Sequence, residues 1–272
     1  MAGTAHSVKK AQTERICIDE SDAVGHVAAR TEARPLLLGH RGARPLSHFR
    51  LATAKENIPP ENTHACFEYA LANGCDGFEF DVRATRDGRL VICHNAWVRG
   101  YKVSASSFET VCARCRMILP RLEDVLSVFG NRAYLDIEVK VPGCEPRIVE
   151  AIRKHRPSSG FMVSSFLPQV LCRLHHLDRS VPLGYVCNRA SNLGAWRELP
   201  IRVFLPHHKL ITKHLVEHVH ERGIQIYTWT VNREAELRQF AEWGVDGLIS
   251  DDPKLLHRVF RRPAPMVSKS RA

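Results

Sequence analysis

Long apolar runs are the most evident absence in this 272-residue sequence. Nowhere do about 18 apolar residues stand together, which is the length that a membrane-spanning helix requires. Residues 1–10 are followed by no apolar stretch of about 7 to 15 residues, the central part of a secretory signal. We therefore expect a cytoplasmic protein without a transmembrane segment.

Two further absences concern cofactors and cross-links. No glycine-rich loop of the kind that cradles nucleotide phosphates is present. The nine cysteines are odd in number, and several fall inside predicted strands or helices, where a reduced thiol packs as a small apolar group. These cysteines are Cys66, Cys93, Cys172 and Cys187. A reducing compartment fits this usage better than a disulfide framework.

The charge balance favours an anionic partner without choosing one. The formal net charge is +10 at pH 7, which suits an anionic small molecule, nucleic acid or an acidic lipid surface alike. Basic residues crowd the C-terminal end from Arg258 to Arg271. We interpret residues 259–272 as a solvated basic tail and expect no nucleic-acid partner, with a role at a membrane surface or on nucleic acid as the alternative.

The middle of the chain alternates between strand and helix patterns. Residues 1–34 lack sustained periodicity, and we expect a poorly ordered extension there, followed by a single domain over residues 35–258. Strands are predicted at residues 36–40, 77–82, 134–139, 161–165, 182–186, 202–205, 225–231 and 246–250. Helices are predicted at residues 65–71, 120–129, 145–155, 167–177, 209–222 and 233–243, and irregular structure at residues 43–59 and 95–119. This alternation predicts an α/β fold, a (βα)8 TIM barrel with its active site at the C-terminal ends of the strands.

The stretch of residues 77–94 carries the strongest functional signal. Glu79 and Asp81 stand two apart in an apolar strand, so both side chains point to the same face. Burying an unpaired carboxylate costs roughly several kcal/mol, so the pair implies a cation or solvent beside it. Asp87-Gly88 predicts a tight hairpin turn after the second strand, and the return arm brings His94 back to the level of Asp81.

Other polar residues fall at the same rim of the predicted barrel. His40 and Arg41 follow the first strand, Glu138 and Lys140 lie two apart at the end of the third, and Trp229 lies late in the seventh. Misassigned strands would have scattered these residues, so their coincidence supports the barrel.

The collected residues predict a phosphoryl-transfer site. Carboxylates without a cysteine among them select a hard divalent ion, Mg²⁺ or Ca²⁺, and these ligands are Glu79, Asp81 and Glu138. Arg41 and Lys140 add fixed positive charge that suits a phosphate beside the metal. His40 and His94 can serve as general base and general acid, in an order that the sequence leaves open.

A set of short motifs carries a resemblance to a known family. In chain order they are Gly39-His-Arg-Gly42, Pro60-Glu-Asn-Thr63, Glu79-Phe-Asp81, Thr85-Arg-Asp-Gly88, His94, Leu135-Asp-Ile-Glu-Val-Lys140, Ser164-Ser-Phe166, Thr228-Trp-Thr-Val-Asn232 and Gly244-Val-Asp-Gly247. Over about residues 35–256 the sequence resembles the glycerophosphodiester phosphodiesterase family.

The resemblance implies a phospholipase-C-like barrel that hydrolyses glycerophosphodiesters to sn-glycerol 3-phosphate and an alcohol. It implies an acid–base pair, metal ligands and phosphate contacts at the positions named above. It adds Trp229 as an aromatic wall near the glycerol. The oligomeric state is not indicated.

The sequence departs from the family pattern at three places. Asn95 stands where the family usually has Asp, the connection from Gly42 to Pro60 is longer, and the segment of residues 95–119 is shorter. Substrate choice should reside in these loops, so the reaction class transfers more safely than the alcohol. The alternatives are a phospholipase-D-like activity on lysophospholipids, which an exposed apolar patch on the loops would favour, and a non-catalytic barrel that binds phosphorylated ligands.

Several polar motifs have simpler interpretations. Glu61 could reach the metal, although a charged residue beside a helix start needs no such role. The pair Cys112 and Cys115 has no second pair to complete a zinc site, so a metal or redox role is the minority interpretation. Two further histidine pairs are interpreted as rim residues and as the polar edge of a helix, namely His207-His208 and His214 with His218.

Overall fold

The computed structural model describes residues 34–45 and 57–260. The predicted N-terminal extension, apart from Arg34, lies outside these residues. So do residues 46–56 of the predicted long connection and residues 261–272 of the predicted basic tail. Among the described helices, none has the length and apolar character that crossing a bilayer requires.

Eight parallel strands close into a barrel, which confirms the predicted fold. β1 (Leu36–His40) pairs with β2 (Gly77–Ala84) on one side and with β11 (Gly247–Ser250) on the other. The strands between them are β6 (Tyr134–Val139), β7 (Phe161–Ser165), β8 (Leu183–Cys187), β9 (Val203–Pro206) and β10 (Gln225–Thr228). β10 is shorter than predicted, so Trp229 lies one residue beyond its end.

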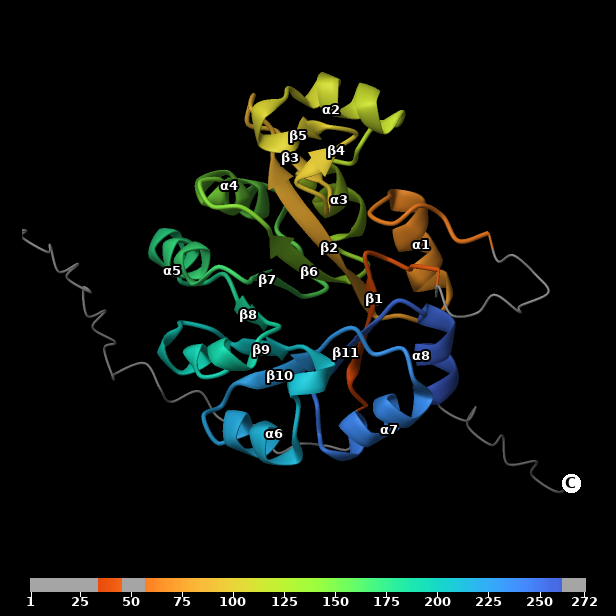
Figure 1. Ribbon diagram of the computed structural model, residues 1–272, viewed down its shortest axis with the longest axis vertical. Coiled ribbons are helices and arrows are strands. Elements are labelled where there is room, and N and C mark those ends of the chain that lie inside the picture. The colour runs from red at the N-terminus through yellow and green to blue at the C-terminus, as the bar shows by residue number, and fades with distance from the viewer. Residues whose placement is uncertain (1–33, 46–56, 261–272) are drawn as a thin grey trace, which may run out of the picture. The chain divides into compact units, whose positions relative to one another are not determined.

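Helices surround the barrel (Figure 1). They are α1 (His64–Ala72), α3 (Leu122–Phe129), α4 (Glu145–His155), α5 (Pro168–Leu177), α6 (Lys213–His220), α7 (Glu234–Glu242) and α8 (Pro253–Phe260). The crossover from β8 to β9 has only the 3-10 helices η3 (Ala190–Asn192) and η4 (Ala195–Glu198). The N-terminal part of the predicted helix 209–222 is the 3-10 helix η5 (His208–Leu210), and α6 begins after Thr212, whose side chain accepts a hydrogen bond from the Leu215 amide.

The predicted hairpin forms after β2. β3 (Leu90–Ile92) runs antiparallel to the end of β2, and Gly88 at the turn has a φ of +77°, a value that favours glycine. The amide of Cys93 donates to the carbonyl of Asp81 at 2.9 Å. This register places the neighbouring His94 beside the carboxylate strand, as predicted.

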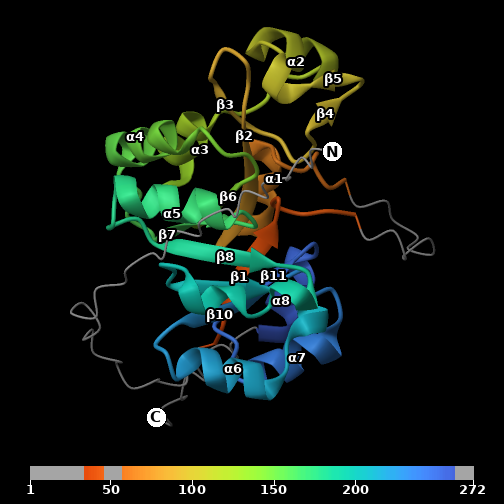
Figure 2. The ribbon, with the colours of Figure 1, turned by 60° about the vertical axis from the view of Figure 1, so that its left-hand side comes forward.

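Residues 95–119, here called the rim segment, contain regular elements, so the prediction of irregular structure there was wrong. The segment contains β4 (Trp97–Val98), β5 (Tyr101–Lys102), η2 (Val103–Ala105) and α2 (Phe108–Cys115). These elements are too short to give a clear periodicity, and they are held by a small separate core of Val91, Cys93, Val103, Val111 and Leu119. In Figures 1 and 2 the rim segment lies beyond the end of the β2–β3 hairpin.

Alternation along the strands separates the core from the site. Phe78 and Phe80 of β2 point outward and pack with Phe67 and Phe129 of the surrounding helices, with Phe67 stacked on Phe78 at 4.1 Å between ring centroids. The intervening residues of β2 point into the barrel. There a second apolar cluster consists only of strand residues, namely Leu38, Met162, Val186, Val203, Leu205, Tyr227 and Ile249. The polar residues of β1, β2 and β6 lie above this layer at the C-terminal rim.

Candidate active site

A cavity of about 300 Å³ opens among the predicted site residues. Its charged wall comes from β1, β2, the β2–β3 hairpin and β6, and its apolar wall from residues in and after β7 to β11. The lining residues are His40, Arg41, Glu79, His94, Asp136, Glu138, Lys140, Phe166, Val186, Asn188, Leu205, Trp229 and Ile249. Of the eight predicted site residues, only Asp81 does not line the cavity, and it lies just behind this wall, paired with Lys140 and Arg41.

The local sequence explains how β1 delivers its two residues. Gly39 has no room for a side chain, because a Cβ would lie 2.0 Å from the carbonyl oxygen of Gly42. Gly42 has a φ of +86°, and Arg41 itself adopts a φ of +53° in this turn. The turn lets the Arg41 amide donate to Glu79 Oε2 at 3.0 Å while its side chain reaches Asp81. The glycines of this motif are therefore required by the backbone.

Three buried carboxylates lie close together at the charged wall, with Asp81 just behind it. One oxygen each of Glu79, Asp81 and Glu138 lies within 4.8 Å of the others, and among the described residues no other group of three or more Asp, Glu, His or Cys is so arranged. Burial, together with the charges of Asp81 and Glu138, raises the pKa of Glu79 well above its usual value. Burial also raises the pKa of Glu138. The two groups therefore need nearby positive charge to ionise.

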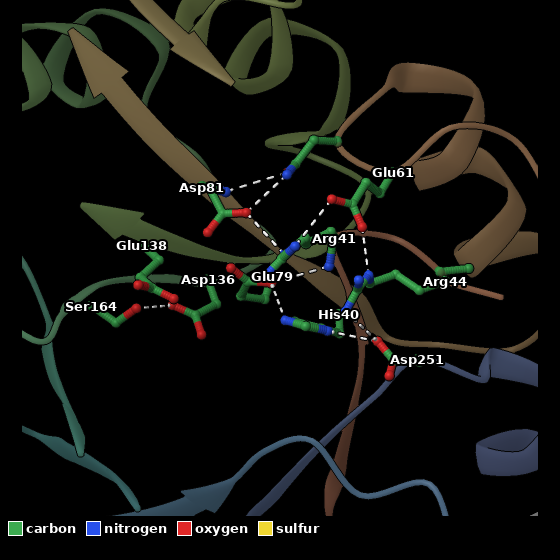
Figure 3. A network of polar contacts seen from close by, with 12 residues as sticks. His40, Arg41, Arg44, Glu61, Glu79, Asp81, Asp136, Glu138, Ser164 and Asp251 are labelled. Atoms are coloured by element: carbon green, nitrogen blue, oxygen red, sulfur yellow. Dashed lines mark hydrogen bonds and ion pairs between the residues drawn. The ribbon is translucent and has the colours of Figure 1, made fainter. Parts of the chain in front are cut away.

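Two cations lie against these carboxylates. The Lys140 ammonium bridges Glu138 Oε1 and Asp81 Oδ1, the latter at 2.9 Å. Arg41 Nε lies 3.1 Å from Asp81 Oδ2. Although burial opposes ionisation of Asp81, Lys140 and Arg41 hold its pKa below the usual value. Figure 3 shows Arg41 between Asp81 and Glu61.

The residues present fit a divalent cation. Glu79 Oε1 is buried and has no hydrogen-bond partner, so one strong oxygen ligand is unused. The set contains only oxygen donors, which suits Mg²⁺ or Ca²⁺. When all three carboxylates are ionised, they exceed the positive charges of Arg41 and Lys140 by one, and this excess would repel a phosphodiester. A divalent cation would reverse that balance and leave one positive charge for the anionic substrate.

His40 is oriented by a residue that the sequence analysis did not single out. Asp251, which follows β11, lies 2.7 Å from His40 Nδ1 through its Oδ1. Its Oδ2 accepts from Asn232 Nδ2 at 2.7 Å, and its amide donates to Asn232 Oδ1 at 2.9 Å. Burial opposes ionisation of Asp251, but the hydrogen bond from His40 lowers its pKa below the usual value. The ionised carboxylate therefore accepts from Nδ1 and leaves His40 Nε2 free, 3.9 Å from Glu79 Oε2 (Figure 3).

His94 faces the cavity from the hairpin. Its Nδ1 lies 3.0 Å from Asn95 Oδ1, so this ring nitrogen is occupied by the side-chain amide of Asn95. Arg83 donates from Nε and Nη2 to the His94 carbonyl at 2.9 and 2.8 Å, which fixes the backbone. Burial lowers the pKa of His94.

The apolar wall is built around Trp229. Its Nε1 donates to the Leu205 carbonyl at 2.9 Å, and the ring meets Phe166 edge to face at 5.5 Å between centroids. His207 also packs against Trp229, at 5.1 Å between ring centroids, while the His208 amide donates to the Trp229 carbonyl. Neither His207 nor His208 lines the cavity.

Two more residues of the site have roles that the sequence analysis did not assign. Thr63 caps α1, and the preceding Asn62 donates from Nδ2 to Asp81 Oδ2 at 2.8 Å. Asp136 faces Glu79 across the β2–β6 register, and burial raises its pKa to about 8. Ser164 donates to Asp136 at 2.6 Å (Figure 3). The signal for Asp136 was its position two residues before Glu138 on the same strand face.

Glu61 lies outside the carboxylate cluster. Its two oxygens pair with Arg41 Nη1 at 3.0 Å and with Arg44 Nε. These contacts give Glu61 a position between two arginines rather than at the metal site. Cys112 and Cys115 lie on α2 beside the small core of the rim segment.

Comparisons with known proteins identify the family of this chain. Residues 40–255 match the model of the Glycerophosphoryl diester phosphodiesterase family. A glycerophosphodiester phosphodiesterase of Caldanaerobacter subterraneus subsp. tengcongensis is 28% identical over 254 residues, which cover 84% of this chain and 99% of the relative. A lysophospholipase D of Rattus norvegicus is 24% identical over 271 residues, covering 79% and 85%.

The fold is also shared with solved structures. An Oleispira antarctica phosphodiesterase, solved in complex with the product sn-glycerol-3-phosphate, superposes with a TM-score of 0.69 at 21% identity, covering 83% of this chain and 96% of that one. The chain belongs to the glycerophosphoryl diester phosphodiesterase family and is an enzyme of that family, a phosphoric diester hydrolase.

Proposed function

We propose that this enzyme hydrolyses glycerophosphodiesters to sn-glycerol 3-phosphate and an alcohol, with a divalent ion held by Glu79, Asp81 and Glu138. The supporting observation is one cavity in which oxygen ligands, two cations and two histidines face an apolar wall. Membership of a hydrolase family sets aside the alternative of a non-catalytic barrel.

The metal ion would be Mg²⁺ or Ca²⁺, because the cluster offers only carboxylate oxygens. When bound, it would supply positive charge to a non-bridging phosphate oxygen. Arg41 and Lys140 would contact the other phosphate oxygens. Both cations are already oriented by buried carboxylates, so little side-chain freedom is lost when the phosphate binds.

His40 and His94 would carry the protons. Each Nδ1 is engaged by a side-chain oxygen, of Asp251 and of Asn95, so each ring has Nε2 left for the substrate. One histidine removes a proton from the nucleophile, which is either a water molecule or a glycerol hydroxyl whose cyclic phosphate product is then opened by water, and the other donates a proton to the leaving alkoxide. The two rings come from β1 and from the hairpin, so they approach the phosphate from different elements.

The apolar wall would receive the carbon skeleton of the glycerol. Trp229 is fixed by its hydrogen bond to Leu205 and by the edge contact with Phe166, so it presents a rigid surface opposite the charged wall. A glycerophosphodiester has the same division into an anionic phosphate and a carbon-rich glycerol.

The proposal is tested by following release of glycerol 3-phosphate from glycerophosphocholine and glycerophosphoethanolamine. We expect release by the wild type with Mg²⁺ or Ca²⁺, none with chelator, and loss in His40→Ala and His94→Ala. His176→Ala, an exposed histidine on α5 that does not line the cavity, is the matched control and should keep full activity. Full activity of His40→Ala, or activity that survives chelation, would contradict the proposal.

A second candidate substrate is a lysophospholipid. The observation that favours it is the group of exposed apolar side chains on the rim segment, including Trp97 and Ile118. It is also in keeping with the similarity to the rat lysophospholipase D. Release of lysophosphatidic acid and choline from lysophosphatidylcholine would identify this activity in the same assay series.

A further inference from the structure

Exposed apolar side chains are concentrated in one place. Five large apolar side chains are exposed among the described residues, and all but Val128 belong to the rim segment. The four are Trp97, Tyr101, Met117 and Ile118. Ile118 is 81% exposed and Trp97 59%, so these side chains contribute little to the core. Such a concentration marks an interaction surface.

The same segment is strongly basic. Arg99, Lys102, Arg114 and Arg116 are all exposed, and the single acidic residue of the segment is Glu109. Tryptophan and tyrosine are the residues that favour the headgroup level of a bilayer, and basic side chains beside them are attracted to anionic lipids. The combination therefore matches an anionic membrane surface in both polarity and charge.

The exposed side chains stand on a built platform. The rim segment has its own buried core beneath β4, β5 and α2. Arg99 and Gly100 form the tight turn between β4 and β5 with φ values of +45° and +85°. Tyr101 is braced by Arg114, which donates from Nη2 to the tyrosine hydroxyl at 2.6 Å and lies 4.1 Å from the ring centroid. The surface is therefore presented without a large ordering cost.

The platform is joined directly to the active site. The rim segment begins at Asn95, which contacts the ring of His94, and the Arg86 amide of the β2–β3 hairpin donates to the Ser106 carbonyl at 2.9 Å. Both views place the segment at the far end of that hairpin (Figures 1 and 2). A surface bound by the rim segment would thus lie close to the cavity, because the β2–β3 hairpin joins the two by a short, hydrogen-bonded connection.

We propose that the rim segment docks this enzyme reversibly on anionic bilayers. Trp97 and Tyr101 sit at the headgroup level, Met117 and Ile118 enter the acyl boundary, and the basic residues contact lipid phosphates. The aliphatic side chains favour a bilayer over nucleic acid, because Ile118 and Met117 offer no ring for base stacking. The docking does not depend on which diester is hydrolysed and is tested by binding alone.

The test is co-sedimentation of the full chain with vesicles of phosphatidylcholine containing about 30% phosphatidylserine, and with phosphatidylcholine alone. Binding should require the anionic lipid and weaken with salt. Loss of two basic residues in Arg99→Ala/Lys102→Ala should weaken binding about 25-fold, at about fivefold for each charge. Trp97→Ala/Ile118→Ala should weaken it about tenfold.

Matched controls lie elsewhere on the surface. Val128→Ala removes the fifth exposed apolar side chain, and Arg179→Ala removes an exposed arginine outside the rim segment. Both should bind like the wild type. Since every altered side chain is exposed, all variants should keep the wild-type melting temperature, which reports folding.

Tryptophan fluorescence gives a second readout. The fluorescence emission of the exposed Trp97 should shift to shorter wavelength when the protein binds vesicles, and Trp97→Phe should lose that shift. The proposal is overturned by absent vesicle binding, by equal binding of the rim variants and the controls, or by a Trp97 spectrum that vesicles leave unchanged. Rim-dependent binding to duplex DNA or to another protein without vesicle binding would also overturn it.

Discussion

The hydrogen bond between Asp251 and His40 offers the sharpest test of how the site is built. Asp251→Asn keeps the shape of the side chain but removes its charge. Because Asp251 accepts from both His40 and Asn232, the amide must turn its NH₂ group toward one of these two donors. If the NH₂ group faces His40, it favours the wrong tautomer, and if it faces Asn232, two donors meet.

The magnitude follows from the kind of bond that is lost. The carboxylate is ionised, since its pKa is lowered by the hydrogen bond from His40 in spite of burial. A hydrogen bond to a charged group contributes about 1.5–3 kcal/mol, which corresponds to a roughly 10- to 150-fold fall in kcat. KM should change little, because Asp251 does not line the cavity.

The assay is steady-state release of glycerol 3-phosphate, with a thermal melt to confirm folding. Asp252→Asn makes the same chemical change at the next residue. Asp252 accepts from the Leu255 amide at the start of α8, a role that asparagine also fills. This control should keep wild-type kcat. A kcat for Asp251→Asn within about twofold of the wild type would refute the positioning role.

Three further predictions concern the hairpin, the core and the rim segment. Asn95→Asp places a carboxylate 3.0 Å from His94 Nδ1 and should raise the pKa of His94, which burial now lowers; the His94 limb of the pH–rate profile should move to higher pH, whereas Asn95→Ala should not move it upward. Phe129→Ala empties a fully buried aromatic site and should lower the free energy of unfolding by about 3–5 kcal/mol in denaturant titration; a loss below about 1 kcal/mol would contradict the packing. The double variant Cys112→Ser/Cys115→Ser should keep the wild-type activity and the wild-type zinc content, and a loss of bound zinc would show a zinc role for this pair.

The barrel and the rim were predictable because they depend on local patterns. Short apolar runs that end in polar residues predicted the strands, and strand ends share one rim whatever the order of pairing. Glu79 and Asp81 show this well: their spacing of two predicted a shared face, and β2 places both side chains inside the barrel.

The partners of the site residues were harder to predict because they depend on long-range contacts. Asp251 meets His40 across the closure of the barrel, 211 residues away, and no spacing rule connects them. Asn62 lies just before α1, adopts a φ of +60° and bonds to Asp81, 19 residues away. The rim segment and α8 were not predicted because their elements are short, and in the sequence the apolar residues of α8 run directly into the basic residues from Arg258 onward.

Direct measurement of divalent-ion binding tests the central proposal, that Glu79, Asp81 and Glu138 hold the metal. Calorimetric titration with Mg²⁺ and Ca²⁺ should show a single site in the wild type and none in Glu79→Gln, which removes the ligand with an unpartnered buried oxygen. Glu61→Gln is the matched control and should keep the site, because Glu61 pairs with Arg41 and Arg44. Wild-type affinity in Glu79→Gln, or loss of the ion in Glu61→Gln alone, would contradict the assignment.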